Sequence, residues 1–477
     1  ISEELRAFFS DIDMALKSHR HLLGGKINDI DRKIITDALG QAGSKYRERV
    51  YENGFSGKKE EVNIKQLTDF TVTAVQHIEH TIEANRRPDH LYQAYNLLTI
   101  SHNSIALSPL GEMLEGQVAA LSSGYPDSEE ALRLLDTLRK SALYSPKQES
   151  YLLYPNRELP RFLEKNSIPN ELLRKSILLQ QLVSDNNRQI VVCDAEGGCH
   201  FNGEFRFAGD LEAALNSLQN THYGQLVESE KGLVMNIFEE VFNHKAFTGR
   251  SGTFFAYEGL GSVYWHMVSK LHLAVQEVCL IAYNENCDKE TISRLTAHYY
   301  EIGKGIGIHK SPAQYGAFPT DPYSHTPHHR GAQQPGMTGQ VKEDILIRFT
   351  ELGVVIDDGR LSLKPFLLDK NEFLPEPGHI TFIDIHGNEQ KITLEPGSLC
   401  FSYCQVPVVC TFSDGNSIEM HYTDGSTEKF PSTSLTPAAS NAIFRRTGEV
   451  SLVQVYIDRE NMKVNEYPPE HVKTVLS

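Results

Sequence analysis

The sequence predicts a multidomain protein, first α and then β: a helical domain over residues 1–355 and an antiparallel β-sandwich over residues 356–477. In the first part, apolar residues recur at the spacing of a buried helical face, as at Leu132, Leu135 and Leu138. In the last part, short runs of β-forming residues are separated by turn sequences such as Asp-Gly. Many helices followed by many strands indicate separate domains and not a doubly wound sheet.

The same patterns predict the individual elements. Helices are expected over residues 3–17, 30–41, 66–83, 109–121, 128–140, 171–183, from 211 (with Asp210 as its N-cap), 228–242, 263–283, 289–302 and 341–352. Strands are expected over residues 360–364, 379–385, 390–394, 399–403, 408–412, 417–422, 426–430, 441–445 and 451–457, with a small β insertion near 189–202. Helical hairpins joined by long polar and aromatic loops favour an α/α toroid whose loops meet at one end to line a cleft. A bundle or a solenoid is the alternative, and no fixed repeat period supports a solenoid.

Composition excludes several classes of partner. The 477 residues are 40% hydrophobic and 23% charged, with a formal net charge of -16. Proteins that bind nucleic acid usually carry a basic patch, so a nucleic acid is not expected as the main partner. No apolar run approaches the roughly 18 to 20 residues of a membrane helix and no signal peptide opens the chain, so no membrane is expected either. The first residue is Ile, which leaves the true N-terminus and secretion open, and a homodimer is also left open.

The seven cysteines are scattered and odd in number, which does not indicate a disulfide framework. Neither Cys193 with Cys199 nor Cys400 with Cys404 has the CxxC spacing of a zinc site. We therefore expect buried free thiols, a reducing compartment and a cytoplasmic location.

Two unusual loops, residues 248–266 and 315–340, each lead into a helix. Ser262 is the expected N-cap of the first helix, which places His266 in or next to its first turn. In the second loop Thr338 can cap the next helix, and the Thr338 hydroxyl with the amides of Gly339 and Gln340 would form a small anion nest. Helix N-termini attract anions, so a cavity that both termini face would hold phosphate.

The same loops contain the side chains that a carbohydrate cleft requires, because sugar rings stack on aromatic faces while planar polar groups bind the hydroxyls. The aromatic residues are Phe254, Phe255, Tyr257, Tyr264, Trp265, Phe318 and Tyr323, and they alternate with Glu258, Asp321, His325 and Gln333. In the alternative interpretation the aromatic residues are core residues, with Tyr264-Trp265 packed between helices. The histidines at 325, 328 and 329 fit no strong metal signature, so no metal is expected.

The order of these features resembles the inverting glycoside phosphorylases of the cellobiose and chitobiose phosphorylase type. The segment Glu258-Gly-x-Gly-x-x-Tyr-Trp-His266 resembles that family's Glu-x-Gly-Gly…His segment. The run from Tyr315-Gly-Ala-Phe-Pro to Thr338-Gly339, followed by a helix and Gly359-Arg-Leu-Ser-Leu-Lys-Pro365, is similar to its Thr-Gly loop and the opening of its C-terminal domain. The resemblance spans residues 85–365 in feature order.

The resemblance implies a six-hairpin α/α toroid with His266, Thr338 and Gly339 at the phosphate and Glu258 at a sugar hydroxyl. Such enzymes need one general acid and no protein base, because phosphate itself attacks the anomeric carbon. The family's acid is an Asp in a Gly-Asp-Trp-Asn-Asp type loop, and this sequence has no such string. The candidates in the matching region are Asp89, which is favoured because it lies in a loop before aromatic residues, then Glu112, and more remotely Glu115.

The leading hypothesis is therefore an enzyme that cleaves a glucoside or related oligosaccharide with inversion, and phosphorolysis is favoured over hydrolysis. Inorganic phosphate is the co-substrate and no other cofactor is expected. The expected sugar contacts are Arg250, Tyr257, Glu258, Trp265, Asp321, His325 and Gln334. One alternative is an inverting hydrolase in which Glu258 or Asp321 is the base. The other is a non-catalytic toroid that binds sugar, or the C-terminal part of a larger protein whose chemistry lies upstream.

Overall fold

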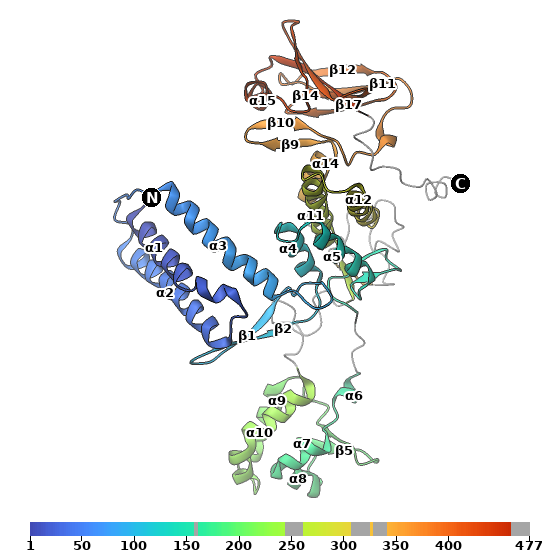
Figure 1. Cartoon of the computed structure of the whole chain (residues 1–477). Coiled ribbons are helices and arrows are strands. Elements are labelled where there is room, and N and C mark those ends of the chain that lie inside the picture. Colours follow the sequence, from blue (N-terminus) through green and yellow to red (C-terminus); the bar gives the residue numbers. More distant parts are fainter. Residues whose placement is uncertain (157–160, 244–260, 307–324, 328–340, 459–477) are drawn as a thin grey trace, which may run out of the picture. The chain divides into compact units, whose positions relative to one another are not determined.

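The computed structural model describes residues 1–156, 161–243, 261–306, 325–327 and 341–458 (Figure 1). The chain divides into two compact units. The first unit comprises Ile1–Leu153 and Val263–Ser477, and the second is Tyr154–Ser262. The predicted domain boundary near residue 355 lies inside the first unit of this division and stays a prediction.

The first unit opens with three long helices, α1 (Glu3–Ser18), α2 (Asp29–Asn53) and α3 (Ile64–Ala84). Each begins at a polar cap: Ser2, Asn28 and Asn63 accept hydrogen bonds from backbone amides of the first turns. A short 3-10 helix, Arg20–Gly24, follows α1. The three predicted helices of this region are confirmed, and α2 continues well beyond the expected end at residue 41.

The next segment differs from the prediction. Residues predicted to begin a helix at 109 instead end an antiparallel hairpin of β1 (Asn96–Ile100) and β2 (Ile105–Pro109). Helix α4 begins only at Leu114 and runs to Ser122, and α5 spans Ser128–Lys140 as predicted. A second, very short hairpin, β3 (Tyr144–Ser145) with β4 (Ser150–Tyr151), follows.

Helix α11 (Trp265–Asn284) is the centre of the helical core of this unit. It packs against α4, α5, α12 (Lys289–Lys304) and α14 (Val341–Glu351). Its buried side chains lie on most sides of the helix, as expected for a helix surrounded by others. Polar residues are buried along it too, and Gln276 donates from Nε2 to the carbonyl of Ile347 on α14 at 2.9 Å.

The C-terminal part contains a five-stranded mixed sheet in the order β13-β14-β17-β15-β16. The strands are β13 (Ser398–Tyr403), β14 (Val406–Ser413), β15 (Ser417–Tyr422), β16 (Thr427–Phe430) and β17 (Val450–Asp458). Strands β14 and β17 are parallel, so the predicted fully antiparallel sandwich is wrong on this point. Of residues 441–445, predicted as a strand, 441–444 belong to helix α15 (Pro437–Phe444), and the chain between the parallel strands β14 and β17 passes through β15, β16 and α15.

Two further hairpins complete this part: β9 (Val354–Asp357) with β10 (Arg360–Leu363), and β11 (Gly378–Ile383) with β12 (Glu389–Leu394). The β9–β10 hairpin and α15 contribute to one apolar core with the sheet, which includes Leu361, Ile443, Val453 and Val455. A short 3-10 helix, Lys370–Glu372, is tied to α14 by Arg348, which binds Glu372.

The second unit has its own apolar core. Its helices are α6 (Phe162–Lys165), α7 (Asn170–Lys175), α8 (Ile177–Ser184), α9 (Ala208–Leu218) and α10 (Gly224–Phe242). The predicted strand pair is present as β5 (Val191–Cys193) and β6 (Cys199–Phe201). The helix predicted over 171–183 is broken at Ser176, and Asp210 lies in the first turn of α9 and not at its N-cap, which is Phe207.

A disulfide joins Cys193 to Cys199 across the β5–β6 hairpin, so the expectation of free thiols is wrong for this pair. The two cysteines face each other directly in the strand register, which the spacing of six residues did not reveal. The argument for a reducing compartment loses this support, and the cytoplasmic location stays a prediction.

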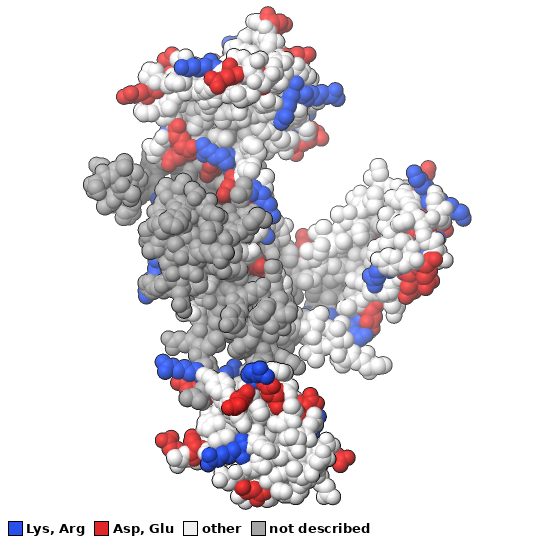
Figure 2. Space-filling view, turned by 180° about the vertical axis from the view of Figure 1, so that it is seen from behind, with Lys and Arg blue, Asp and Glu red and all other residues white. Residues whose placement is uncertain are grey.

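The helices within the described residues do not identify a toroid, so that architecture stays a prediction. None of the described helices is long and apolar enough to span a bilayer. On the face shown in Figure 2, the basic and acidic side chains of the described residues are interspersed.

Candidate functional site

The described residues of the two loops singled out in the sequence pair with each other just before α11. Strand β7 (Ser262–Tyr264), directly before α11, forms a two-stranded sheet with β8 (His325–Pro327), which lies in the second loop. Ser262 is thus a strand residue and not the predicted N-cap. The N-cap of α11 is Tyr264, whose side chain makes no capping hydrogen bond.

A direct contact joins the first turns of the two helices. His266, the second residue of α11, lies with Nε2 at 3.2 Å from Oε1 of Glu343, the third residue of α14. The other ring nitrogen, Nδ1, is 3.4 Å from the hydroxyl of Tyr264. The N-termini of α11 and α14 therefore converge, as the phosphate hypothesis requires.

Glu343 is almost completely buried, with 3% of its surface exposed. Its Oε1 also lies 3.6 Å from Nζ of Lys342, whose side chain is mostly exposed. Its Oε2 is buried and has no hydrogen-bond partner among the described residues. Burying a carboxylate is costly unless it is paired, so a residue of this kind usually has a task beyond packing.

Glu343 is the residue that sequence analysis missed, because apolar periodicity indicated the wrong face of α14. Apolar spacing over residues 341–352 places Ile345 and Phe349 on the expected core face, but these residues are 51% and 39% exposed, whereas Glu343 and Ile347 are buried. The available signal was position: an acidic residue in the first turn of the helix that follows Thr338-Gly339, where the helix dipole favours a carboxylate.

Trp265 is fully buried at the start of α11. A sugar can stack only on an aromatic face that it can reach, so the ring of Trp265 has no open face for a ligand in this arrangement. The alternative interpretation, in which this residue packs between helices, fits its burial.

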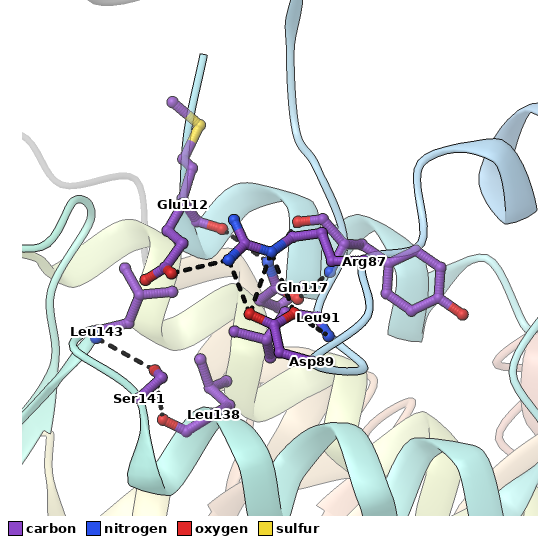
Figure 3. A network of polar contacts seen from close by, with 10 residues as sticks. Arg87, Asp89, Leu91, Glu112, Gln117, Leu138, Ser141 and Leu143 are labelled. Carbon is purple, nitrogen blue, oxygen red and sulfur yellow. Dashed lines mark hydrogen bonds and ion pairs between the residues drawn. The ribbon is translucent and has the colours of Figure 1, made fainter. Parts of the chain in front are cut away.

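The region expected to supply the general acid contains a second charged cluster (Figure 3). Arg87 donates from Nη2 to Asp89 Oδ2 at 2.7 Å and to Glu112 Oε1 at 2.8 Å, so the two candidate acids share one guanidinium. The Nε of Arg87 also contacts Asp89, at 3.1 and 3.2 Å, and the amide of Leu91 donates to Asp89 at 3.2 Å. Figure 3 shows both carboxylates pointing at the guanidinium.

These contacts hold the pKa of Asp89 below its usual range, mainly because Arg87 hydrogen-bonds to the ionised carboxylate. They raise the pKa of Arg87 for the same reason. A general acid must carry a proton near neutral pH, so the lowered pKa weighs against Asp89 in this role.

The remoter candidate, Glu115, accepts a hydrogen bond from the hydroxyl of Tyr95 at 2.7 Å. Both residues line a groove of about 410 Å³ that is also bordered by Asn85 and Gln93. This groove lies between the end of α3 and α4.

Most of the expected sugar and phosphate contacts lie outside the described residues. They are Arg250, Tyr257, Glu258, Asp321, Gln334, Thr338 and Gly339. The backbone of His325 is part of β8, and its side chain is outside the description. Of the predicted phosphate ligands, the structure thus describes the side chain of His266.

Comparison with known families gives a match for part of the chain. Residues 159–245 match the family model described as "GH149 phosphorylase insertion domain 2". This range lies within the second unit of the structure, so the compact body with its own core corresponds to a recognised insertion domain. A comparison with curated proteins finds no match for the chain.

The matched segment is thus similar to an insertion domain of glycoside phosphorylases, and more particularly to one of the GH149 phosphorylases. The resemblance to the cellobiose and chitobiose type is not shown by this match.

Proposed function

We propose that the protein cleaves a glycosidic bond of an oligosaccharide by phosphorolysis with inversion at the anomeric carbon. The observation that carries the proposal is the convergence of the first turns of α11 and α14 at His266 and Glu343. It is supported by the match of the second unit to a phosphorylase insertion domain. Two helix N-termini and an imidazole are suited to hold a phosphate ion.

The proposed reaction needs two groups on opposite faces of the sugar. Phosphate, held near His266, attacks the anomeric carbon through one of its oxygens, and the bond from that carbon to the leaving oxygen breaks. A carboxylic acid donates its proton to the leaving oxygen, which departs as a sugar hydroxyl. The products are a sugar 1-phosphate and a shortened oligosaccharide, and the carboxylate regains its proton from solvent.

The acid is proposed to come from the cluster around Arg87. Asp89 was favoured on sequence grounds, but its contacts with Arg87 and the amide of Leu91 stabilise the ionised form. Glu112 receives a single hydrogen bond from the same guanidinium. We therefore assign the acid to Glu112, with Asp89 as the alternative.

The remaining roles are carried over from sequence analysis as proposals. Thr338 and Gly339 complete the phosphate site with His266. Glu258, Arg250, Tyr257, Asp321, His325 and Gln334 contact the sugar. Trp265 is left out of the sugar site because it is buried.

A phosphate-dependence assay tests this function. The chain is incubated with a panel of glucosides and oligosaccharides, with and without inorganic phosphate, and the products are followed by ¹H NMR. We expect a sugar 1-phosphate of inverted anomeric configuration that forms only when phosphate is present. Release of free reducing sugar at the same rate without phosphate would instead support the inverting hydrolase, and binding without turnover would support a non-catalytic role.

A further inference from the structure

A buried carboxylate beside the proposed phosphate ligand has no role in the reaction as described so far. Glu343 is 3% exposed and contacts His266 across the junction of two helices. Replacing such a residue by an apolar one of similar size would remove the cost of burying the charge. If this position served packing alone, a carboxylate would lower the stability of the fold relative to an apolar side chain.

The geometry of the pair fixes the imidazole in two ways. An ionised carboxylate can only accept, so Nε2 of His266 is the donor and carries a hydrogen. This fixes the tautomer, and the anchor on α14 fixes the plane of the ring. The other nitrogen, Nδ1, makes a long hydrogen-bond contact of 3.4 Å with the Tyr264 hydroxyl, and a ligand at shorter distance would replace this weaker partner.

We propose that Glu343 is a positioning residue for His266: it holds the Nε2–H tautomer and turns Nδ1 toward the phosphate. In the neutral ring Nδ1 accepts from a P–O–H group, and in the doubly protonated ring it donates to a phosphate oxygen. This inference rests on the proposed function for its ligand, but the tautomer and ring orientation are properties of the protein alone.

Position in the fold supports this assignment. Glu343 lies in the first turn of α14 and contacts the first turn of α11 through His266. The helix dipole stabilises a carboxylate there, which reduces the cost of its burial. Residues on a rigid helix hold a ligand-binding side chain in position more accurately than residues on a loop do.

Three variants separate positioning from packing and from charge. In Glu343→Gln the amide oxygen can still accept from Nε2–H, whereas Glu343→Ala removes the acceptor. Asp344→Asn is the matched control, because it removes one negative charge from the same helical turn at a mostly exposed residue. Melting temperatures are measured for all three, so that a loss of folded protein is not mistaken for a loss of function.

Kinetics with phosphate as the varied substrate give the first readout. We expect Glu343→Ala to raise KM for phosphate on the order of tenfold, as for the loss of a group that orients a ligand, with a smaller change in kcat. Glu343→Gln should restore KM to within a factor of about three, and Asp344→Asn should behave like the wild type. Equal damage in the Gln and Ala variants would overturn the proposal, because it would mean that the hydrogen bond is not what matters.

The tautomer of His266 is the second readout and needs no turnover. Long-range ¹H–¹⁵N NMR of histidine-labelled protein, with His266 assigned through His266→Gln, should show Nε2–H in the wild type and in Glu343→Gln. Glu343→Ala should lose this preference. If the wild type makes no sugar 1-phosphate but the tautomer follows Glu343 in this way, the proposed function fails and the positioning role stands. If turnover is present and the tautomer is the same in all variants, the positioning role fails alone.

Discussion

At the scale of single residues, two charged clusters are proposed to have separate tasks. The pair of His266 and Glu343 is sheltered from solvent and lies where two helices begin. The cluster of Arg87, Asp89 and Glu112 is more exposed and lies in the segment that precedes α4. An inverting phosphorylase needs an anion site and an acid on opposite faces of the sugar, and these clusters supply one candidate for each.

The first residue-scale prediction concerns the acid. We expect Glu112→Gln to lower kcat for phosphorolysis by 10²-fold or more, on the order of the contribution of a general acid. A glycosyl fluoride, whose leaving group needs no proton from the enzyme, should restore most of the rate in this variant. Asp89→Asn should have a smaller effect that the fluoride does not repair. If instead Asp89→Asn shows the larger loss of kcat and the glycosyl fluoride restores it, Asp89 is the acid.

The second residue-scale prediction concerns pH and stability. His272 of α11 is 8% exposed and stacks on Tyr299 with ring centroids 4.3 Å apart. Burial lowers its pKa to about 4, below the usual value near 6.5. Between these two values the unfolded chain binds a proton that the folded chain does not, so stability is complete above pH 6.5 and is lost as the pH falls toward 4.

We expect this loss to reach on the order of 3 kcal/mol at the acid end of that window. His272→Phe keeps a ring that can stack on Tyr299 and removes the titration. Chemical unfolding at pH 7 and at pH 4.5 should therefore show a smaller acid destabilisation in the variant than in the wild type. An identical pH dependence in the two proteins would show that His272 does not titrate as described.

At the scale of elements, the local sequence pattern predicted the helices and strands whose bounds depend on neighbouring residues. Helix α5 was predicted with its observed bounds, because an Asp127 cap, acidic residues at its start and basic residues at its end agree with its apolar stripe. Strand β15 was likewise predicted with its observed bounds. Two strand pairs were missed: the local β1–β2 hairpin, and β7 with β8, whose partner lies about 60 residues away by sequence number and so beyond the reach of a local pattern.

The candidate site shows the same division. Sequence placed His266 at the start of a helix and predicted that a second helix start would face it, since both features follow from the loops that precede the helices. It could not predict Glu343, because α14 packs on α11 with the face that carries Glu343 and Ile347 buried and with Ile345 exposed. Tertiary contacts decide which face of a helix is buried when its apolar stripe is weak.

The element-scale prediction concerns the packing of α4 on the segment before β1. A Cβ at Gly116 would lie 2.9 Å from both the amide nitrogen of Ala94 and the carbonyl oxygen of Tyr92. These are backbone atoms that cannot move aside cheaply, so we expect Gly116→Ala to destabilise the first unit by about 1–3 kcal/mol. Gly40→Ala is the control in α2, where a Cβ meets nothing within 4 Å.

The control should be neutral or stabilise by up to about 1 kcal/mol, because alanine favours a helix. Thermal unfolding of both variants beside the wild type makes the comparison. If Gly116→Ala is no less stable than Gly40→Ala, then α4 and the residues around Tyr92 do not pack as closely as described.

At the scale of the whole molecule, the chain is organised as two units with separate cores. The proposed anion site around His266 and the Arg87 cluster both belong to the first unit. The family match falls on the second unit, whereas the residues proposed to hold phosphate and to supply the acid, His266 and Glu112, lie in the first. Homodimer formation and cytoplasmic location remain predictions at this scale.

The disulfide offers a test of this division. Cys193 and Cys199 close a short loop within the second unit, and a loop of this size contributes about 2 kcal/mol in the chain-entropy description. We expect the double variant Cys193→Ser/Cys199→Ser to lower the melting temperature of one calorimetric transition and to leave another unchanged. A shift of the whole unfolding profile by the same amount would mean that the two units unfold as one.

The central claim is that phosphate binds where α11 and α14 begin, and a crystal structure of the chain with phosphate tests it most directly. We predict an anion within hydrogen-bond distance of Nδ1 of His266, roughly 2.7–3.2 Å, and in contact with Thr338 and Gly339. A phosphate bound elsewhere, with His266 and Thr338 more than about 10 Å apart and thus beyond reach of one anion, would contradict the account.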